Sequence, residues 1–465
     1  MRKVRISRPR AARSLVLGVA AAGMLLGNGP AKAAIAGTGA APGKPVTAAP
    51  STGFDAFYRS RGNRPLWLDP KAGNAAKDLI ALLRSASLDG LDPARYRPDA
   101  LEALVAAARP TDPASMIRAD AALSMAFTDY VGDQRRAAAR GEGVTYVDPS
   151  LRPAPPTPLA LLLRAQAAPS LDGYVKSMSW MHPIYIGLRA ALADPALTAD
   201  RRAQLTLNLD RARALPPASG RYIIVNAAQQ RLFAYDDAKV AETMRVVVGK
   251  TKHQTPMLAA YVRYAALNPY WYVPADLAAE DVGQYVAKSG LKYLDTYGYE
   301  VVDSLEPDAH VLDPAKVDWK GVNSGKVQVL IRQKPGPKNF MGRMKFMFPN
   351  AFGVYLHDNP RRELFEKAER FYSGGCVRLE DASRLGQWLF GHPLDWQAAG
   401  TEQQVPLARP VPVYITYLTA VPDETGTGIA YFDDAYGRDA AKTVDAQTPA
   451  GEGAGAGAAK VVAER

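Results

Sequence analysis

Residues 221–250 read RYIIVNAAQQRLFAYDDAKVAETMRVVVGK, and they mark the start of a β-rich half of the chain. Short β-branched and aromatic runs alternate with turn residues, such as those that follow Asn226 and the pair Asp236 and Asp237. That alternation is typical of strands joined by tight turns. We therefore expect a mainly-β domain that begins near residue 217.

The chain before this stretch has the spacing of amphipathic helices. Apolar residues recur there at intervals of three and four. The clearest segments are 75–91, closed by Gly90, and 116–138, 158–168 and 199–215. They contain few strand signals and little obvious chemistry, so we predict a helical scaffold domain over residues 53–216.

Further strand-like runs come after the opening stretch, at 261–274, 326–333, 352–357 and 411–420. Among them lies a long insertion, at about 275–343, which begins with the helical pattern ADLAAEDVGQYVAKSG. An insertion of that length inside a β domain is usually functional, such as a lid, or forms a small subdomain. The expected fold class is α+β, with a helical domain followed by a β domain at 217–440.

The N-terminus has the three parts of a secretory signal peptide. Basic residues without acidic ones precede the apolar run SLVLGVAAAGMLLG at 14–27, and Ala31 and Ala33 form a small-residue cleavage pattern. The run is shorter than the roughly 20 residues that span a bilayer. We predict a signal peptide at 1–33 and export to the periplasm, with an uncleaved inner-membrane anchor as the alternative.

Two further segments have the composition of unstructured chain. Residues 34–52 are rich in Ala, Gly and Pro and predict a flexible linker, and residues 441–465 predict a disordered tail. The net charge is +11, and seven of the positive charges lie in residues 1–33, which leaves +4 for the rest. So small a charge excludes a nucleic-acid binder and is compatible with an anionic wall polymer.

Cys376, in the stretch FYSGGCVRLE at 371–380, is the only cysteine of the chain. In an oxidising compartment a single cysteine cannot form an internal disulfide, so it is either a reactive thiol or an inert buried side chain. One cysteine and five dispersed histidines show no ligand spacing, and we expect neither a metal nor a cofactor.

The neighbours of Cys376 favour a reactive thiol. Gly374 and Gly375 allow a tight turn and expose backbone N–H groups, the material of an oxyanion hole. Arg378 adds a permanent cation. Residues 379–391 have the pattern of a helix, and we expect the dipole at its N-terminus to lower the pKa of the thiol.

His357 is the candidate base. It ends the apolar run VYLH, which predicts a rigid core strand, and it lies 19 residues before the cysteine. Tyr355 is expected on the same strand face, because alternate strand positions share a side, and Asp358 on the opposite one. The other four histidines keep a structural interpretation: His182, His253, His310 and His392.

The blocks YLHDNP at 355–360 and YSGGCVRL at 372–379 resemble the signature of the L,D-transpeptidases, which have a YkuD-type catalytic domain. The resemblance is to the large Gram-negative branch and covers roughly residues 53–440. Six more blocks carry it, namely FYRSRGNRPLWLDP, SLDGLDPARY, VVVGKTKHQTPM, NPYWYVP, IRQKPGPKNFMGRMKFMFPN and DDAYGRD.

The resemblance implies a peptidoglycan cross-linking enzyme. Cys376 would be the nucleophile, His357 the general base and acid, and the Gly375 N–H an oxyanion donor. The substrates would be peptidoglycan stem peptides, as donor and as acceptor, and the product a 3→3 cross-link with release of D-alanine. Other cell-wall synthesis proteins are possible partners.

The resemblance also assigns a substrate-binding group with open alternatives. Arg378 either binds a stem carboxylate or braces the loop, and Ser373 either bonds to substrate, fixes the histidine or shapes the turn. Tyr355 lines the cleft. Gly374 occupies a position where many relatives have a second histidine, so substrate contacts are expected to differ there.

Three other functions share these motifs or part of them. A carboxypeptidase would transfer the same acyl group to water, and a lipoprotein transferase would transfer it to a lysine. A non-catalytic wall-binding protein would keep the fold without the chemistry. The large branch often carries a peptidoglycan-binding module within its scaffold, and residues 170–215 leave no room for a complete one.

Overall fold

The computed structural model describes residues 52–139, 143–306, 308–397 and 402–439. The expected signal peptide and tail lie outside these ranges, as does the expected linker except for Thr52, which begins helix α1 (Thr52–Ser60). Within the described ranges, no helix has both the length and the hydropathy needed to cross a membrane.

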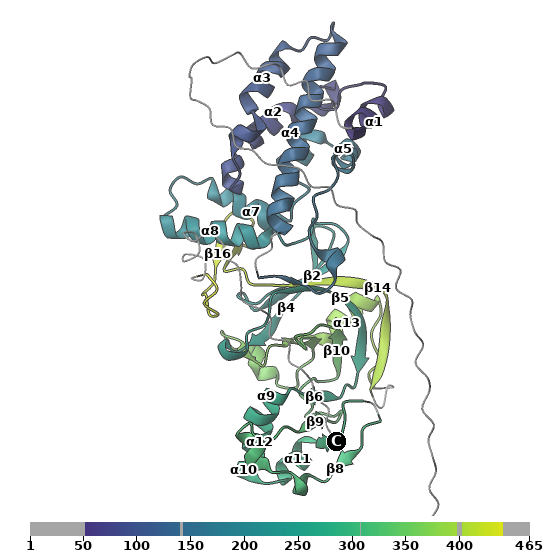
Figure 1. Ribbon diagram of the computed structural model, residues 1–465, viewed down its shortest axis with the longest axis vertical. Helices are drawn as coiled ribbons and strands as arrows, with labels where there is room; N and C mark the ends of the chain where they lie inside the picture. The colour runs from purple at the N-terminus through teal and green to yellow at the C-terminus, as the bar shows by residue number, and fades with distance from the viewer. Residues whose placement is uncertain (1–51, 140–142, 307, 398–401, 440–465) are drawn as a thin grey trace, which may run out of the picture. The chain divides into compact units, whose positions relative to one another are not determined.

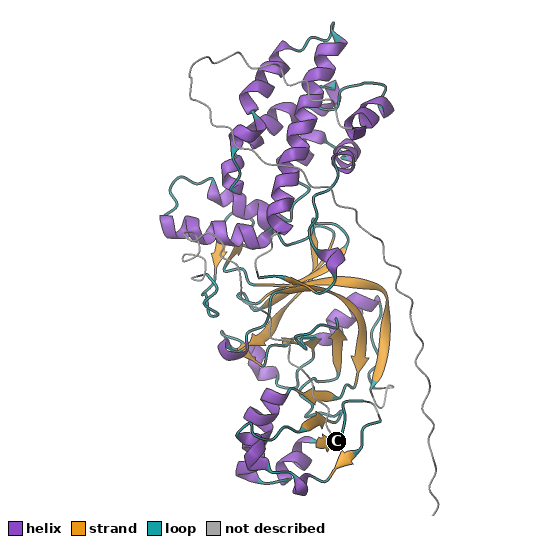
Figure 2. Cartoon of the chain, in the orientation of Figure 1, coloured by secondary structure: helices purple, strands orange, loops and turns teal. Residues whose placement is uncertain are grey.

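The first part of the described chain is helical, as predicted (Figure 2, purple). After α1 come α2 (Ala75–Arg84), α3 (Pro98–Ala107), α4 (Pro113–Ala139), α5 (Pro158–Ala167), α6 (Leu171–Lys176), α7 (Pro183–Leu192) and α8 (Ala199–Ala212). Thr157, Ser170 and Thr198 accept backbone N–H groups at the starts of α5, α6 and α8, which fixes where these helices begin. One departure is a short strand, β1 (Thr145–Tyr146), which pairs with the β domain.

The β domain is a ten-stranded sheet that closes on itself (Figure 2, orange). Its other strands are β2 (Arg221–Asn226), β3 (Arg231–Asp236), β4 (Lys239–Gly249), β5 (Leu258–Leu267), β10 (Met344–Met347), β11 (Leu356–His357), β12 (Phe371–Ser373), β13 (Val377–Leu379) and β14 (Gln403–Thr416). The order is β5-β10-β11-β13-β4-β3-β2-β14, and β14 pairs again with β5. The closed ring leaves these strands without a free edge.

Strand β2 shows how the barrel meets the helices. Tyr222 and Ile224 belong to the core that the helices share, together with Leu209 of α8, whereas Ile223 and Val225 belong to the barrel core. Successive strand residues point to opposite faces, so both faces of β2 are buried, and its four central residues, 222–225, are aromatic or aliphatic. The early change of sequence pattern at β2 therefore marks the joint between the two regions.

The insertion has a sheet and a core of its own (Figure 1). The sheet has the order β6-β9-β7-β8, from β6 (Trp271–Val273), β7 (Tyr299–Val302), β8 (Val311–Leu312) and β9 (Leu330–Gln333). Its helical part comprises α9 (Ala275–Leu277), the π-helical turn Ala278–Gly283, α10 (Gln284–Ser289), α11 (Lys292–Tyr297) and α12 (Trp319–Asn323). The run at 326–333 and the end of the run at 261–274 thus lie in this second sheet and not in the barrel.

Helix α13 (Ala382–Phe390) comes after β13 and packs on the barrel. Its Leu385 and Leu389 belong to the barrel core, and its Gly386 lies against Phe346 of β10. A two-stranded sheet, β15 (Ala420–Pro422) with β16 (Ile429–Tyr431), completes the described part. The predicted class, a helical scaffold followed by a mainly-β domain, is confirmed.

Candidate active site

Three neighbouring barrel strands place Lys345, His357 and Arg378 in one row. Lys345 of β10 is the Cα partner of His357 in β11, and His357 is the partner of Arg378 in β13. Residues paired across strands point to the same face. His357 therefore lies between two basic residues, one on each side.

Cys376 directly precedes β13, and the strand register places it opposite Tyr355. Strands β11 and β13 are parallel, with Leu356 paired to Val377, and the Val377 N–H donates to the Tyr355 carbonyl at 3.0 Å. Because alternate positions share a face, Cys376 and Tyr355 lie on the face of His357 and Arg378. The partly buried thiol donates to the Gly353 carbonyl at 3.5 Å. Among the described residues no hydrogen bond joins the thiol to the imidazole.

The ring of His357 is buried, with 1% of the residue exposed. Its Nδ1 lies 2.6 Å from the carbonyl oxygen of Asp358. A carbonyl only accepts, so Nδ1 carries the proton and Nε2 keeps a free lone pair. Burial, followed by the charges of Arg378 and Lys345, lowers the pKa of His357 to about 3, so the ring is neutral.

The thiol is not activated as the sequence predicted. Residues 377–379 form β13, and α13 begins only at Ala382, where Asp381 caps it by accepting the Arg384 N–H. The thiol therefore precedes a strand, and the expected helix dipole does not act on it. Burial raises the pKa of Cys376 to about 11, and the Tyr355 backbone and the charges of Arg378 and Lys345 oppose this rise.

The loop before the thiol is held by its own hydrogen bonds. Ser373 is 1% exposed, and its hydroxyl donates to the Cys376 carbonyl at 2.6 Å and accepts from the Gly375 N–H at 3.1 Å. This arrangement favours the turn role of Ser373 over a bond to substrate. The Gly375 N–H, which the sequence suggested as an oxyanion donor, is bonded to the Ser373 hydroxyl in this arrangement.

Gly375 is required by the shape of this loop. Its φ is 119°, a conformation in which a Cβ is strained. Its carbonyl accepts from the Thr255 hydroxyl at 2.8 Å, which ties the loop to the segment after β4.

The remaining predicted residues surround the thiol. The Arg378 Nε is buried without a hydrogen-bond partner among the described residues, and burial lowers the pKa of Arg378 to about 10. Burial and the nearby Cys376 raise the pKa of Tyr355 to about 12. Gly374 lies under Leu277 of α9, since a Cβ at position 374 would be 2.8 Å from Leu277 Cδ1.

Sequence reasoning missed Lys345 and Glu402. Lys345 is 8% exposed; its Nζ lies 3.5 Å from Glu402 Oε1 and 5.8 Å from the centre of the Tyr355 ring. The one available signal was a lysine inside the apolar run MKFMF at 344–348. Such a side chain needs a buried partner, but the sequence does not show that Glu402, far along the chain, supplies it.

The other histidines bond to groups outside this row: His182 to Tyr222, His253 to Glu280, His310 to Asp303 and His392 to the Pro393 carbonyl. In the described part of the chain, no three His, Cys, Asp or Glu side chains come together as a metal site.

Known families match this architecture in two places. A family model described as a scaffold domain matches residues 52–192, and one described as an L,D-transpeptidase catalytic domain matches residues 220–413. A curated protein of Haemophilus influenzae, named as an L,D-transpeptidase, is 30% identical over 243 residues. The match covers 51% of this chain and 48% of that protein, so the chain spans about half the length of the curated relative it matches.

Two solved structures are similar to part of the chain. An L,D-transpeptidase from Mycobacterium smegmatis has 13% identity and a TM-score of 0.21, over 43% of this chain and 59% of that one. L,D-transpeptidase 3 from Mycobacterium tuberculosis, solved with a faropenem-derived adduct, has 11% identity and a TM-score of 0.21, over 44% and 65%. At these TM-scores the similarity carries no argument about this chain.

Proposed function

Because a family model described as an L,D-transpeptidase catalytic domain matches residues 220–413, we propose that this protein is a periplasmic L,D-transpeptidase that forms 3→3 cross-links in peptidoglycan. The observation that carries the proposal is the pairing of β11 with β13. It brings the chain's single thiol and a buried neutral imidazole onto one face of two adjacent strands.

In the first half of the reaction, the Cys376 Sγ attacks the carbonyl carbon of the third residue of a donor stem peptide. His357 accepts the thiol proton at Nε2, because Nδ1 is bonded to the Asp358 carbonyl. The C–N bond to D-alanine breaks, the proton passes to the departing amine, and a thioester remains on Cys376.

In the second half, the side-chain amine of an acceptor stem attacks the thioester carbon. A C–N bond forms, the C–S bond breaks, and His357 carries the amine proton back to the thiol. Transfer to water or to a lipoprotein lysine would use the same thioester, so the acceptor alone separates these alternatives.

The oxyanion needs a hydrogen-bond donor, and the carboxylate of the donor stem needs a cation. We assign the oxyanion to the Cys376 N–H in place of the Gly375 N–H, because hydrogen bonds of the described residues leave the Cys376 N–H free. Arg378 is the carboxylate partner, since its buried Nε has no partner among the described residues.

The test is incubation of the purified protein with disaccharide-tetrapeptides, with products scored by mass spectrometry. We expect a cross-linked dimer from the wild type and none from Cys376→Ala or His357→Ala. His392→Ala, which removes an exposed histidine outside the row, is the matched control and should keep wild-type activity. A mass increase of Cys376-containing protein after exposure to a carbapenem reports the thiol independently.

The products decide among the alternatives. Tripeptide without dimer would show a carboxypeptidase, and tripeptide-linked lipoprotein would show a lipoprotein transferase. If dimer persisted in Cys376→Ala, the cysteine mechanism would be wrong. Wall binding without any product, unchanged in that variant, would show a non-catalytic protein.

A further inference from the structure

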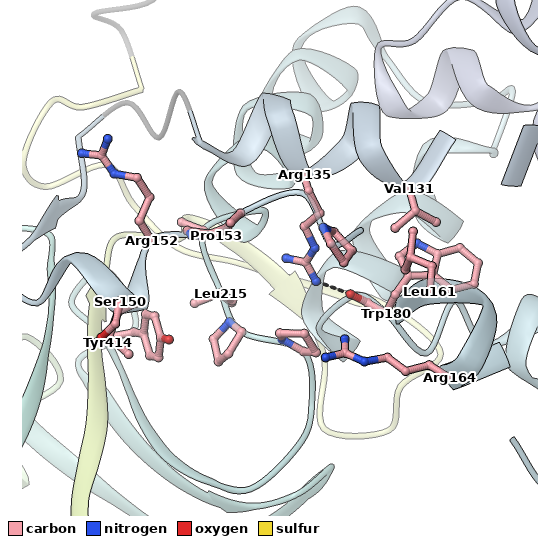
Figure 3. A pocket seen from close by; sticks show the side chains of 16 residues that line it. Val131, Arg135, Ser150, Arg152, Pro153, Leu161, Arg164, Trp180, Leu215 and Tyr414 are labelled. Atoms are coloured by element: carbon pink, nitrogen blue, oxygen red, sulfur yellow. Dashed lines mark hydrogen bonds between the residues drawn. The ribbon is translucent and has the colours of Figure 1, made fainter. Parts of the chain in front are cut away.

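A cavity of about 260 Å³ lies where helices α4 and α5 meet the barrel (Figure 3). Its apolar lining includes Val131 and Leu161 from the helices, Trp180, Leu215 from the connection to β2, and Tyr414 from β14. All five are at least nine-tenths buried. The cavity is therefore a pocket within the folded chain, slightly smaller than the roughly 300–1,000 Å³ typical of pockets that hold drug-sized molecules.

Arg135 points into this pocket without an ionic partner. It is 5% exposed, and its guanidinium donates to the Trp180 carbonyl, as Figure 3 shows. No carboxylate of the described residues forms an ion pair with it. A buried charge is costly unless it is paired, so this guanidinium lacks the group that would offset its burial.

A second cation reaches the same space. The guanidinium of Arg164, from α5, lies near that of Arg135 in the pocket, and Arg164 is exposed at its mouth (Figure 3). Burial, together with the charges of Arg164 and Arg213, lowers the pKa of Arg135 to about 10. Two cations that repel each other beside an apolar wall would both be stabilised by an anion between them.

We propose that this pocket binds a small organic anion, in which a carboxylate or phosphate contacts Arg135 and Arg164 while an apolar body packs on Trp180 and Leu161. A guanidinium presents parallel N–H groups that match either anionic group. This pocket is separate from the candidate active site around Cys376 and His357. Its ligand would contact both the helices and β14, and so would hold the scaffold to the barrel.

The experiment is isothermal titration calorimetry of the Cys376→Ala protein, which removes any contribution from the thiol. The probes are octanoate, octyl phosphate and 1-octanol. We expect saturable one-to-one binding of octanoate or octyl phosphate, at least about tenfold tighter than 1-octanol, because only the anions meet the guanidinium groups. The tighter of the two anions identifies the preferred head group.

Arginine variants locate the site. Arg164→Gln removes an exposed cation and is expected to weaken binding of the anion about tenfold. Arg135→Gln should do the same, provided that its melting temperature shows it to be folded. Arg152→Gln is the matched control, because this arginine lines the pocket's rim but lies over the Tyr146 ring, 5.6 Å from its centre, and points away in Figure 3.

Three results would overturn the proposal. One is the absence of saturable binding of either anion to the Cys376→Ala protein with both arginines in place. Another is binding of 1-octanol as tightly as octanoate, which would show an apolar site. The third is an affinity in Arg164→Gln that falls no further than the affinity in Arg152→Gln.

Discussion

At the scale of single residues, the position of His357 between Lys345 and Arg378 determines how the thiol can be activated. A proton moved from Cys376 to His357 creates an imidazolium beside two cations, which is unfavourable unless negative charge is close. The resting pair is therefore a neutral thiol and a neutral imidazole. A substrate carboxylate on Arg378 would cancel one of the two cations and make the transfer easier, so we expect substrate binding to assist activation.

The charge of Lys345 has a measurable effect on the thiol. In the free protein, alkylation by iodoacetamide should rise about tenfold per pH unit from pH 7 to 10, because the pKa of Cys376 is raised to about 11. Lys345→Gln removes a cation that stabilises the thiolate. At pH 8 this variant should alkylate roughly three to ten times more slowly than the wild type.

Lys367→Gln is the control for that measurement. Lys367 is an exposed lysine whose Nζ lies 4.8 Å from the centre of the Tyr372 ring, close to the same loop in sequence. Its removal changes the net charge equally and should alter the rate less than twofold, since exposed charges are screened. Equal rates in Lys345→Gln and the wild type would show that the buried lysine does not influence the thiolate.

At the scale of elements, Leu277 of α9 packs against Gly374 in the loop that precedes Cys376. A side chain at position 374 would meet Leu277 at 2.8 Å, and Leu277 would have to move. Gly374→Ala should therefore raise the KM for the donor peptide about fivefold and leave folding intact, because α9 would no longer sit closely on the loop.

A second substitution tests this contact. Adding Leu277→Ala to Gly374→Ala should bring the KM for the donor peptide back toward the wild-type value, since it removes the clashing methyl groups. The KM of the single variant Leu277→Ala is the reference for the double variant. Identical KM values for Gly374→Ala with and without Leu277→Ala would show that the effect arises elsewhere. A histidine at this position would meet the same obstacle, because its Cβ would lie equally close to Leu277.

The elements also explain which parts of the site could be predicted. Cys376 was predicted because it is the only cysteine of the chain, and His357 because it ends an apolar run 19 residues before that cysteine. The row with Lys345 depends on strand register, which no local pattern reveals. The three residues of β13 were too few to signal a strand, so the helical pattern of α13 was extended backwards and produced the wrong dipole argument.

At the scale of the whole molecule, His182 links the helices to the barrel. Its Nδ1 accepts the Ile184 N–H at 3.1 Å at the start of α7, so its Nε2 donates to the Tyr222 hydroxyl of β2 at 3.2 Å. Burial, and to a smaller extent the charge of Arg135, lowers the pKa of His182 to about 3. Nδ1 can accept the Ile184 N–H only while the ring is neutral, so protonation of His182 breaks this hydrogen bond.

This linkage predicts sensitivity to acid. The unfolded chain binds a proton at His182 from about pH 6.5 downward, whereas the folded chain does so only near pH 3. The contribution of His182 is therefore complete above pH 6.5 and is lost as the pH falls toward 3, by on the order of 5 kcal/mol. Urea unfolding at a series of pH values should show a shallower decline for His182→Gln than for the wild type.

His310→Gln is the matched variant, because 86% of the His310 side chain is exposed. Its stability curve should run parallel to that of the wild type. A parallel curve for His182→Gln as well would show that this imidazole does not couple pH to folding. His357, whose pKa is also lowered to about 3, should contribute in the same direction and leaves part of the decline in either variant.

The helices and the β region could be predicted because the hydrophobic period changes from three or four to two near Arg221. The closure of the barrel could not be predicted from the sequence. Strand β14 pairs with β2 and with β5, and these pairs join segments that are distant in sequence. The same holds for the second sheet, whose strands have the same local pattern as barrel strands.

The place where the insertion leaves the barrel has a consequence for protein engineering. It departs after Leu267 and returns at Met344, which are Cα partners in the antiparallel pair β5–β10, and the Asn268 N–H continues that ladder to the Arg343 carbonyl at 2.8 Å. The Asn268–Arg343 bond makes Leu267 and Met344 a pair without mutual hydrogen bonds, so their Cα atoms lie about 4.5 Å apart, a distance that a short hairpin turn can span. The insertion is a cassette, which can be exchanged or replaced by a turn without changing the register of any barrel strand.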